Sequence, residues 1–421
     1  MPDTQPPPPD NALHRIATVC SIEMAVLVLL QVLCQKSLYF VNGFGKRLGI
    51  DYYDPYYIGS RLLHLGQTPY LHGRYSAPPF FAAFNGIFLP IDPQILSYGL
   101  SVLSFGILFG CCFFFYKFLQ LEDTIPRAAF LRDTLLMIAF SFPFLFLFDR
   151  ANIDALVLLA LWGGLFFLPT AQWLTGFFFA TGFALKLYPI ILIVPLLILK
   201  KTRAAVSFLL FCGVYVLLQY DQWSIYVLRL LRRTTAFRLD ENGSLAVAFF
   251  YLGKLWDRLV GTDGQAEWTC IGFSAVAYGL VLLATAACDA RIRYEKPTDQ
   301  CGLVLTYFPF MVALPKLVYL YEFIVLLPLA FVCARFARRQ DTPAGRRLAG
   351  LLAVAIALTQ FQGVAFSKLT GSLLWQVVPS LSLLAVMLLL LYAKWRAMMA
   401  QHAACPASAG TDSGRTGGER D

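Results

Sequence analysis

Residues 152–201 read NIDALVLLALWGGLFFLPTAQWLTGFFFATGFALKLYPIILIVPLLILKK, and this stretch decides the class of fold. Apart from Asp154 and Lys186, it holds no charged residue before the lysine pair that ends it. Its apolar runs approach the roughly 20 residues that an α-helix needs to cross a bilayer. We therefore predict three consecutive spans, at 152–168, 172–185 and 187–200, the last two of them short.

The rest of the chain has the same character. Of its 421 residues, 58% are hydrophobic and only 14% are charged, and the mean hydropathy is +0.64. A soluble protein carries about 25% charged residues. We predict an all-α polytopic membrane protein with about 12 transmembrane helices and no separate soluble domain. The expected spans are 16–34, 97–118, 130–148, 152–168, 172–185, 187–200, 204–220, 269–288, 301–315, 317–334, 348–366 and 371–393.

Short basic clusters between the apolar runs predict the orientation, because cytoplasmic loops are enriched in lysine and arginine. One arrangement places all five clusters and both termini in the cytoplasm. The clusters also account for the net charge of +9, so we exclude nucleic-acid binding. Residues 1–15 and 397–421 are predicted to be disordered tails around a transmembrane domain at 16–396. The clusters lie at 117–132, 200–203, 291–296, 335–347 and 394–396.

Two long segments then fall on the outer face, at about 36–96 and 221–268, here named the first and second long loops. In the first, DPYYIGSRLLHLG (54–66) has helical apolar spacing and a glycine stop. APPFFAAFNGIFLPID (77–92) is apolar but too short to span comfortably. In the second, VLRLLRR and AVAFFYLGKLWDRL are amphipathic. We expect helices that lie along the outer membrane surface.

Charged residues inside or beside apolar helices are costly and therefore mark candidate sites. In the predicted topology the unusual polar groups converge on the outer side, which is the layout of a cavity that opens outward. Each also has an ordinary explanation, such as a surface-reaching lysine at position 186 or a local pair of Asp149 with Arg150. The converging residues are Asp51, Asp54, Arg150, Asn152, Asp154, Lys186, Lys316 and Glu322.

Other chemical motifs are absent from the sequence. It has no GxxxxGK[ST], HExxH or GxSxG pattern, and its ten cysteines show no CxxC spacing. We therefore predict no metal and no cofactor. An enzyme built on this chain has to use carboxylates, cations and a membrane-borne substrate.

Residues 49–84, GIDYYDPYYIGSRLLHLGQTPYLHGRYSAPPFFAAF, resemble the opening signature of glycosyltransferase family 87. ANIDALVLLALW (151–162) is similar to the family's Gly-Asn-Ile-Asp segment, and FALKLYPIILIVPLLI (183–198) to its Lys-Leu-x-Pro segment. The resemblance covers roughly 15–335. The signature positions are Asp51, Tyr56, Tyr57, Leu62, Leu63, Gly66, Pro69, Tyr70, Tyr75, Pro78 and Pro79.

The resemblance implies a GT-C type fold in a bacterial inner membrane. It also implies transfer of mannose or a related sugar from a polyprenyl-phosphate donor to a lipid or glycan acceptor at the outer face. The reaction would invert the sugar carbon, with Asp51 as general base. Lys186, Arg150 and Arg61 would bind the donor phosphate. The expected substrate contacts are Asn152, Asp154, Tyr75, Tyr188, Lys316, Tyr321 and Glu322.

The sequence departs from the family pattern in three places. The spacing from Asp51 to the Pro-Tyr pair is one residue long, so Asp54 is an alternative base. Ala151 stands where the family has glycine, and Tyr321 where many members have histidine. Two other functions stay open: a polymerase or ligase of surface polysaccharide, and a transporter or flippase of lipid-linked sugars. The donor sugar, acceptor, metal dependence and oligomeric state are not readable from the sequence.

Overall fold

The computed structural model describes most of the chain between residues 48 and 404. Every regular element in the described part is a helix. The predicted first span at 16–34, the predicted tail at 1–15 and residues 405–421 of the other predicted tail lie outside it. Residues 397–404, which we expected to be disordered, instead form the end of a helix. The described residues are 48–73, 75–118, 127, 130–132, 134–135, 141–232, 245–261, 266–313, 320–326, 329, 342–360, 375 and 377–404.

The helices follow the chain in an order that matches the apolar runs. The first long loop holds η1 (Tyr52–Tyr56), α2 (Tyr57–His64), η2 (Pro69–Leu71) and α3 (Pro79–Gly86). The central part holds α4 (Pro93–Phe118), α6 (Phe142–Arg150), α7 (Asp154–Phe167), α8 (Gln172–Leu185), η4 (Tyr188–Leu192), α9 (Ile193–Ile198) and α10 (Thr202–Leu217). The remainder holds α11 (Tyr220–Arg232), α12 (Leu245–Val260), α13 (Ala266–Asp289), α14 (Pro297–Leu305), α15 (Phe308–Ala313), η6 (Leu320–Leu326), α17 (Pro343–Thr359) and α19 (Val377–Ala404).

Three described helices are long and apolar enough to cross a membrane: Pro93–Phe118, Gly272–Asp289 and Val377–Gln401. A fourth span results if α10 and α11, which meet at a 94° bend, are counted together. The helical positions agree with the predicted runs at 97–118, 152–168, 172–185, 204–220 and 269–288. The total of about 12 spans and their orientation stay predictions.

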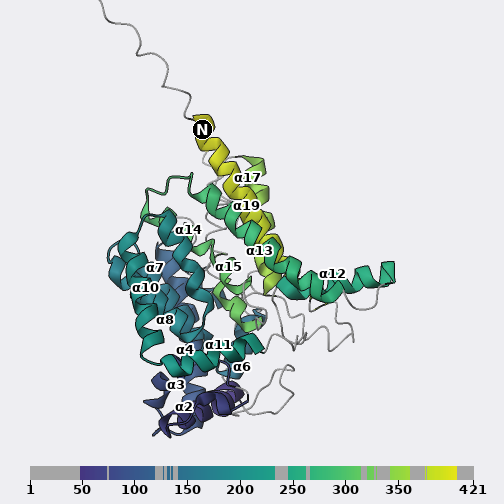
Figure 1. Cartoon of the computed structure of the whole chain (residues 1–421). Helices are drawn as coiled ribbons and strands as arrows, with labels where there is room; N and C mark the ends of the chain where they lie inside the picture. The colour runs from purple at the N-terminus through teal and green to yellow at the C-terminus, as the bar shows by residue number, and fades with distance from the viewer. Residues whose placement is uncertain are drawn as a thin grey trace, which may run out of the picture.

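Glycines bring the central helices into close contact. A Cβ added to Gly176 of α8 would lie 2.5 Å from Ala204 O and Phe208 N of α10. One added to Gly164 of α7 would lie 2.2 Å from the Phe179 ring of α8. Small residues of this kind let membrane helices approach each other. Figure 1 shows α7, α8 and α10 side by side, with α2 and α3 at one end and α14 toward the other.

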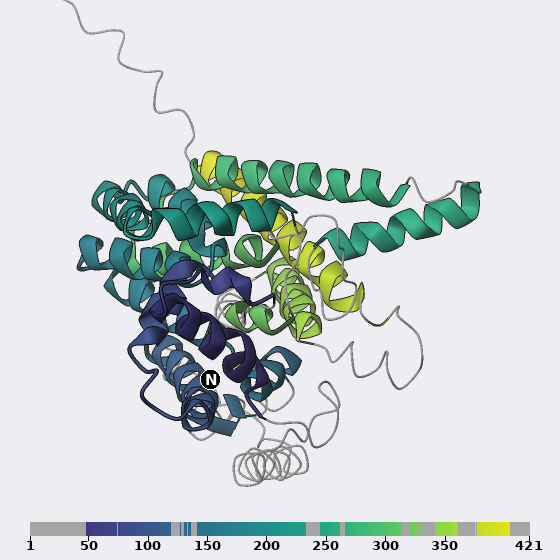
Figure 2. The same cartoon turned by 60° about the horizontal axis from the view of Figure 1, so that its bottom comes forward.

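The helices of the long loops form as the sequence predicts. α2 ends at His64, and Gly66, two residues later, has a φ of +74°. The Gln67 and Gly66 N–H groups donate to Leu62 O (2.9 Å) and Leu63 O (3.0 Å). This paired bonding satisfies the last carbonyls of a helix and favours glycine. α12 leaves the body beside α13 (Figure 2), with Leu255, Trp256 and other large apolar side chains exposed.

The structure differs from the prediction at 301–315, where we expected one span. Two short helices, α14 and α15, occur instead, with a break at Thr306 and Tyr307. Pro309 explains the break, because it has no N–H for the carbonyl of Leu305. The predicted span at 187–200 likewise begins as the 3₁₀ turn η4, which contains Pro189.

Candidate active site

The first long loop is tied to the end of α6 by its backbone. The Gly49 N–H donates to the Asp149 carbonyl at 2.8 Å, and Gly49 has a φ of +76°. A Cβ on Gly49 would lie 2.7 Å from Cβ of Ser97 in α4. Glycine is therefore required here both by conformation and by space. The turn places Asp51, two residues later, against Arg150.

Asp51 is held on both carboxylate oxygens. Arg150 Nη1 donates to Oδ1 at 2.7 Å, and Asn152 Nδ2 donates to Oδ2 at 3.1 Å. The side chains of Asp51 and Arg150 are 17% and 20% exposed, so the ion pair is shielded but reachable. These contacts join residues about 100 positions apart in the sequence. The convergence of Asp51, Arg150 and Asn152 predicted from the sequence is present in the structure.

Ala151 lies between the two residues that hold Asp51. It caps the C-terminus of α6 with φ 49° and ψ 52°, the left-handed conformation. Residues other than glycine and asparagine rarely adopt this backbone conformation, which costs them about 1–2 kcal/mol. A glycine at this position would adopt the same backbone conformation without that cost. The reversal at Ala151 lets Arg150 and Asn152 approach Asp51 from one side.

A second set of contacts begins at Asp154, which is fully buried at the start of α7. Tyr188 donates its hydroxyl to Asp154 Oδ1 at 2.8 Å. Lys186 Nζ lies 3.4 Å from Asp154 Oδ2 and donates to Glu322 Oε1 at 3.2 Å. The side chains of Lys186 and Glu322 are 14% and 6% exposed. One cation thus joins two buried carboxylates from α7 and η6.

The two sets share Asn152, whose Oδ1 accepts the Asp154 N–H at 3.3 Å. Tyr56 is buried beside Asn152 and lies in the electrostatic field of Lys186, Asp51 and Asp154. Burial is the largest influence on Tyr56 and raises its pKa well above the usual range, so the group stays a neutral hydroxyl. We name the whole set the junction cluster. Its members are Asp51, Arg150, Asn152, Asp154, Lys186, Tyr188 and Glu322.

Helix ends supply the charged members of the junction cluster. Asp154 lies in the first turn of α7, whose N-terminal dipole favours an anion. Arg150 lies in the last turn of α6, and Lys186 caps the C-terminus of α8, where the dipole favours a cation. These three charges are therefore placed at the helix ends that stabilise them. The local sequence and the helix boundaries together create a charged site.

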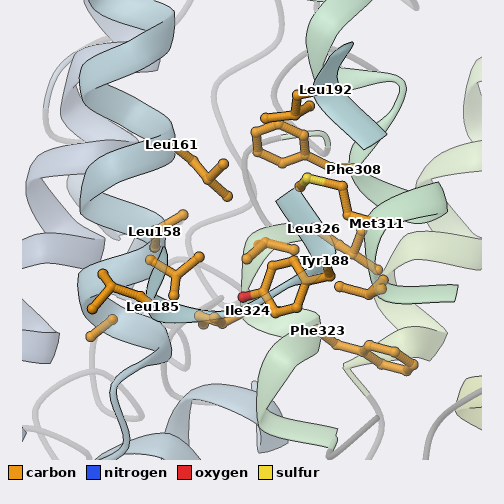
Figure 3. Close-up of a cluster of buried hydrophobic side chains, with 14 of the residues drawn as sticks. Leu158, Leu161, Leu185, Tyr188, Leu192, Phe308, Met311, Phe323, Ile324 and Leu326 are labelled. Atoms are coloured by element: carbon orange, nitrogen blue, oxygen red, sulfur yellow. The ribbon is translucent and has the colours of Figure 1, made fainter. Parts of the chain in front are cut away.

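An apolar core surrounds this polar set. Figure 3 shows Tyr188 between side chains of α7 and α8 on one side and of α15 and η6 on the other. This packing excludes water from much of the cluster and strengthens its electrostatic interactions. The labelled neighbours are Leu158, Leu161, Leu185, Leu192, Phe308, Met311, Phe323, Ile324 and Leu326.

Asp54 and Arg61 lie apart from the junction cluster contacts. The Asp54 carboxylate is 3.4 Å from His72 Nε2, with side chains 29% and 20% exposed. Arg61 is exposed on α2. The structure therefore gives Asp51, not Asp54, the direct connection to Arg150 and Asn152.

Tyr75 is fully buried and packs within the first long loop. Its ring contacts Tyr56 and Tyr70 edge-on, and its hydroxyl donates to Pro78 O at 3.1 Å. In the same loop, the Tyr52 hydroxyl donates to Asn85 Oδ1 at 2.6 Å, a contact that joins η1 to α3. Burial raises the pKa of Tyr52 to about 12, so the Tyr52 hydroxyl remains a donor. Tyr75 thus supports the loop that carries Asp51.

The second long loop also contacts the first. Arg229 of α11 donates from Nη1 to Tyr70 O at 2.5 Å and from Nη2 to the Gly73 carbonyl. Its guanidinium lies 5.9 Å from the Tyr70 ring centroid, and Tyr226 stacks on the same ring. Sequence reasoning missed both residues, because the amphipathic pattern of α11 predicts its helix but not its partners. Two further predicted residues cannot be placed here: Lys316 lies outside the described residues, and only the backbone of Tyr321 is described.

The chemistry available to the junction cluster follows from its donors and acceptors. Asp51 offers a carboxylate at the accessible edge. Arginine carries five N–H donors and lysine three, so Arg150 and Lys186 can each contact more than one acceptor group at the same time. A ligand at the junction cluster would lie beside a carboxylate that can accept a proton and beside the cations of Arg150 and Lys186. This suits a reaction in which a hydroxyl loses a proton and a phosphate gains negative charge.

The fold and the junction cluster together define a helical membrane protein with a charged site at its helix ends. The family model described as Glycosyltransferase family 87 matches residues 75–315. Because this is more than half of the chain, the protein belongs to glycosyltransferase family 87. No curated protein matches the chain. The matched segment includes Arg150 and Lys186, whereas Asp51 and Glu322 lie outside it.

Proposed function

We propose that this glycosyltransferase moves mannose or a related sugar from a polyprenyl-phosphate donor to a hydroxyl of a lipid or glycan acceptor. The proposal rests on one observation: Arg150 and Asn152 both donate hydrogen bonds to the carboxylate of Asp51. The first long loop thereby presents a proton acceptor beside the cations of the central helices. A membrane-embedded chain suits a lipid-borne donor.

In the proposed reaction Asp51 removes the proton from the acceptor hydroxyl. The hydroxyl oxygen forms a bond to the anomeric carbon as the bond from that carbon to the phosphate oxygen breaks. The electron pair leaves with the polyprenyl phosphate, and attack from the opposite face inverts the anomeric carbon. General-base catalysis of this kind contributes about 10²–10⁴-fold to the rate.

Arg150 and Lys186 stabilise the phosphate as its negative charge develops. Both are partly shielded from water, which strengthens their interaction with an anion. Arg61 is exposed on α2 and meets the phosphate only as the donor enters. Asn152, Asp154, Tyr188 and Glu322 orient the substrates or the cations, together with Lys316 and Tyr321. Tyr75 supports the site by packing.

We also propose a GT-C type fold in a bacterial inner membrane, with the junction cluster on the outer face. The support for this is the arrangement of the long loops. In these loops α3 contacts both α2 and α11, and α11 turns 94° from α10. Such a turn fits a helix that leaves a span and follows the membrane surface.

The proposal is tested with membranes prepared from cells that express the wild-type chain. Radiolabelled polyprenyl-phosphate-mannose and a nucleotide-linked mannose are offered as separate donors, with empty-vector membranes as background. We expect label to enter lipid or glycan only from the polyprenyl phosphate, and Lys186→Met to abolish this transfer when equal amounts of folded protein are compared. Transfer from the nucleotide sugar alone, or transfer that survives Lys186→Met, would contradict the proposal.

A further inference from the structure

Gln360, directly after α17, lies at a buried meeting point of three elements. Its Oε1 accepts the hydroxyl of Ser141 at 2.9 Å. Its Nε2 donates to the Phe323 carbonyl at 3.2 Å and to Thr359 Oγ1 at 3.0 Å. Only 7% of Gln360 is exposed. Both ends of the amide are therefore engaged, and the orientation of the side chain is fixed.

The carbonyl that Gln360 holds belongs to the residue after Glu322. Glu322 lies on η6, a 3₁₀ helix of seven residues. Runs of 3₁₀ helix longer than three or four residues are uncommon, because their hydrogen bonds are poorly aligned, and they often mark hinges or strain. A side-chain donor to a η6 carbonyl therefore supports a segment that is weakly stabilised by itself. Glu322 in turn contacts Lys186 at 3.2 Å.

The other end of the amide reaches α6. Ser141 is the N-cap of that helix, and its Oγ accepts the Phe144 N–H at 3.2 Å. The same helix carries Arg150 in its last turn, and η6 packs against it. Gln360 therefore connects the two elements that supply Arg150 and Glu322, although α17 itself provides no member of the junction cluster.

We infer that Gln360 is a positioning residue that holds η6 so that Glu322 sets the place of the Lys186 amine. Lys186 is the cation assigned to the donor phosphate, and an error of about 1 Å in such a group costs up to about 10²-fold in rate. The inference rests on the proposed function for its kinetic readout. Its structural readout is independent of any substrate.

The main variant is Gln360→Met, which keeps the side-chain length and removes both hydrogen-bonding ends. Gln360→Glu keeps the acceptor for Ser141 and removes the donor to Phe323 O and Thr359 Oγ1. Because it also buries a carboxyl group, it is the harsher second variant. The matched control is Gln300→Met. Gln300 donates its amide to the Tyr294 carbonyl at 3.1 Å, the same kind of contact, near Asp289 and away from the junction cluster.

Amide hydrogen exchange of the peptide that contains residues 320–326 is measured for each purified variant in detergent. We expect both Gln360 variants to exchange faster there than wild type, and Gln300→Met to match wild type. Unchanged exchange in this peptide would overturn the inference, whether or not the chain transfers sugar from a polyprenyl phosphate. If wild type transfers none, the proposed function fails while this measurement still decides the role of Gln360.

The kinetic readout is kcat/KM for sugar transfer. We expect Gln360→Met to lower it about 10–100-fold, against less than about 2-fold for Gln300→Met. In a Glu322→Gln background, Gln360→Met should add less than about 2-fold, because both changes disturb one interaction. A full multiplicative loss in that background, or an equal loss in the control, would show a general structural role and overturn the inference.

Discussion

The contact between Gly59 and Tyr75 gives a prediction whose size follows from the structure. A Cβ added to Gly59 would lie 2.3 Å from Tyr75 Cδ2 and 2.7 Å from Cε2. An ordinary contact begins at 3.4 Å, so the shortfall is about 1.1 Å, from 3.4 − 2.3. The ring cannot easily move, because it is fully buried and its hydroxyl is bonded to Pro78 O at 3.1 Å.

Two effects of Gly59→Ala oppose each other. Forcing an extra carbon into a packed core costs about 1–3 kcal/mol, and the fixed ring favours the upper end. Replacing glycine by alanine inside a helix returns about 1 kcal/mol. We therefore expect a net loss of about 2 kcal/mol. In a chain of this length, that lowers the midpoint of thermal unfolding by about 4 °C.

Thermal unfolding of purified protein in detergent, followed by intrinsic fluorescence, measures the effect. Gly106→Ala in α4 is the matched control, because a Cβ there meets no atom within 4 Å. We expect the control to be as stable as wild type or slightly more so. The loss in Gly59→Ala should shrink when Tyr75→Leu removes the ring. Equal midpoints for Gly59→Ala and Gly106→Ala would refute the reasoning.

Three further changes test other contacts. Lys186→Met leaves two buried carboxylates without their cation and should destabilise the protein by about 3–5 kcal/mol, measured by unfolding in detergent. Adding Glu322→Gln should restore part of the lost stability, and no restoration would count against the pairing. Arg229→Met removes two donors from the first long loop, so limited proteolysis should cut that loop sooner, whereas an unchanged pattern would argue that α11 does not hold it. Lys394→Met removes the cation that donates to the buried carboxylate of Asp289 at 2.6 and 2.7 Å. We expect the protein to lose about 3–5 kcal/mol of stability. The double variant with Asp289→Leu should recover most of that stability, and a further loss would contradict the assignment.

Much of the helical framework was predictable, because apolar runs and turn residues act locally. The glycine stop of α2 at Gly66 and the proline-opened α3 follow from backbone conformation alone. The break between α14 and α15 was missed, because hydropathy does not register the missing N–H of Pro309. Span number and orientation stay predictions.

The candidate site was predictable as a set of residues but not as a set of contacts. The cost of charge in apolar segments singled out Arg150, Lys186 and Glu322. The pairing of Lys186 with Glu322 joins positions 136 residues apart, and only packing decides it. Arg229 and Gln360 gave no such signal, since an arginine on an amphipathic helix and a glutamine at a helix end are ordinary residues.

The central claim is that the carboxylate of Asp51 is the general base of sugar transfer. The most direct measurement is the single-turnover rate of transfer from polyprenyl-phosphate-mannose by purified wild type, Asp51→Asn and Asp54→Asn, with Asp299→Asn in α14 as control. We predict a loss of about 10²–10⁴-fold in Asp51→Asn at unchanged thermal stability, and a much smaller change in the other two. Wild-type rates in Asp51→Asn, or a loss confined to Asp54→Asn, would contradict the account.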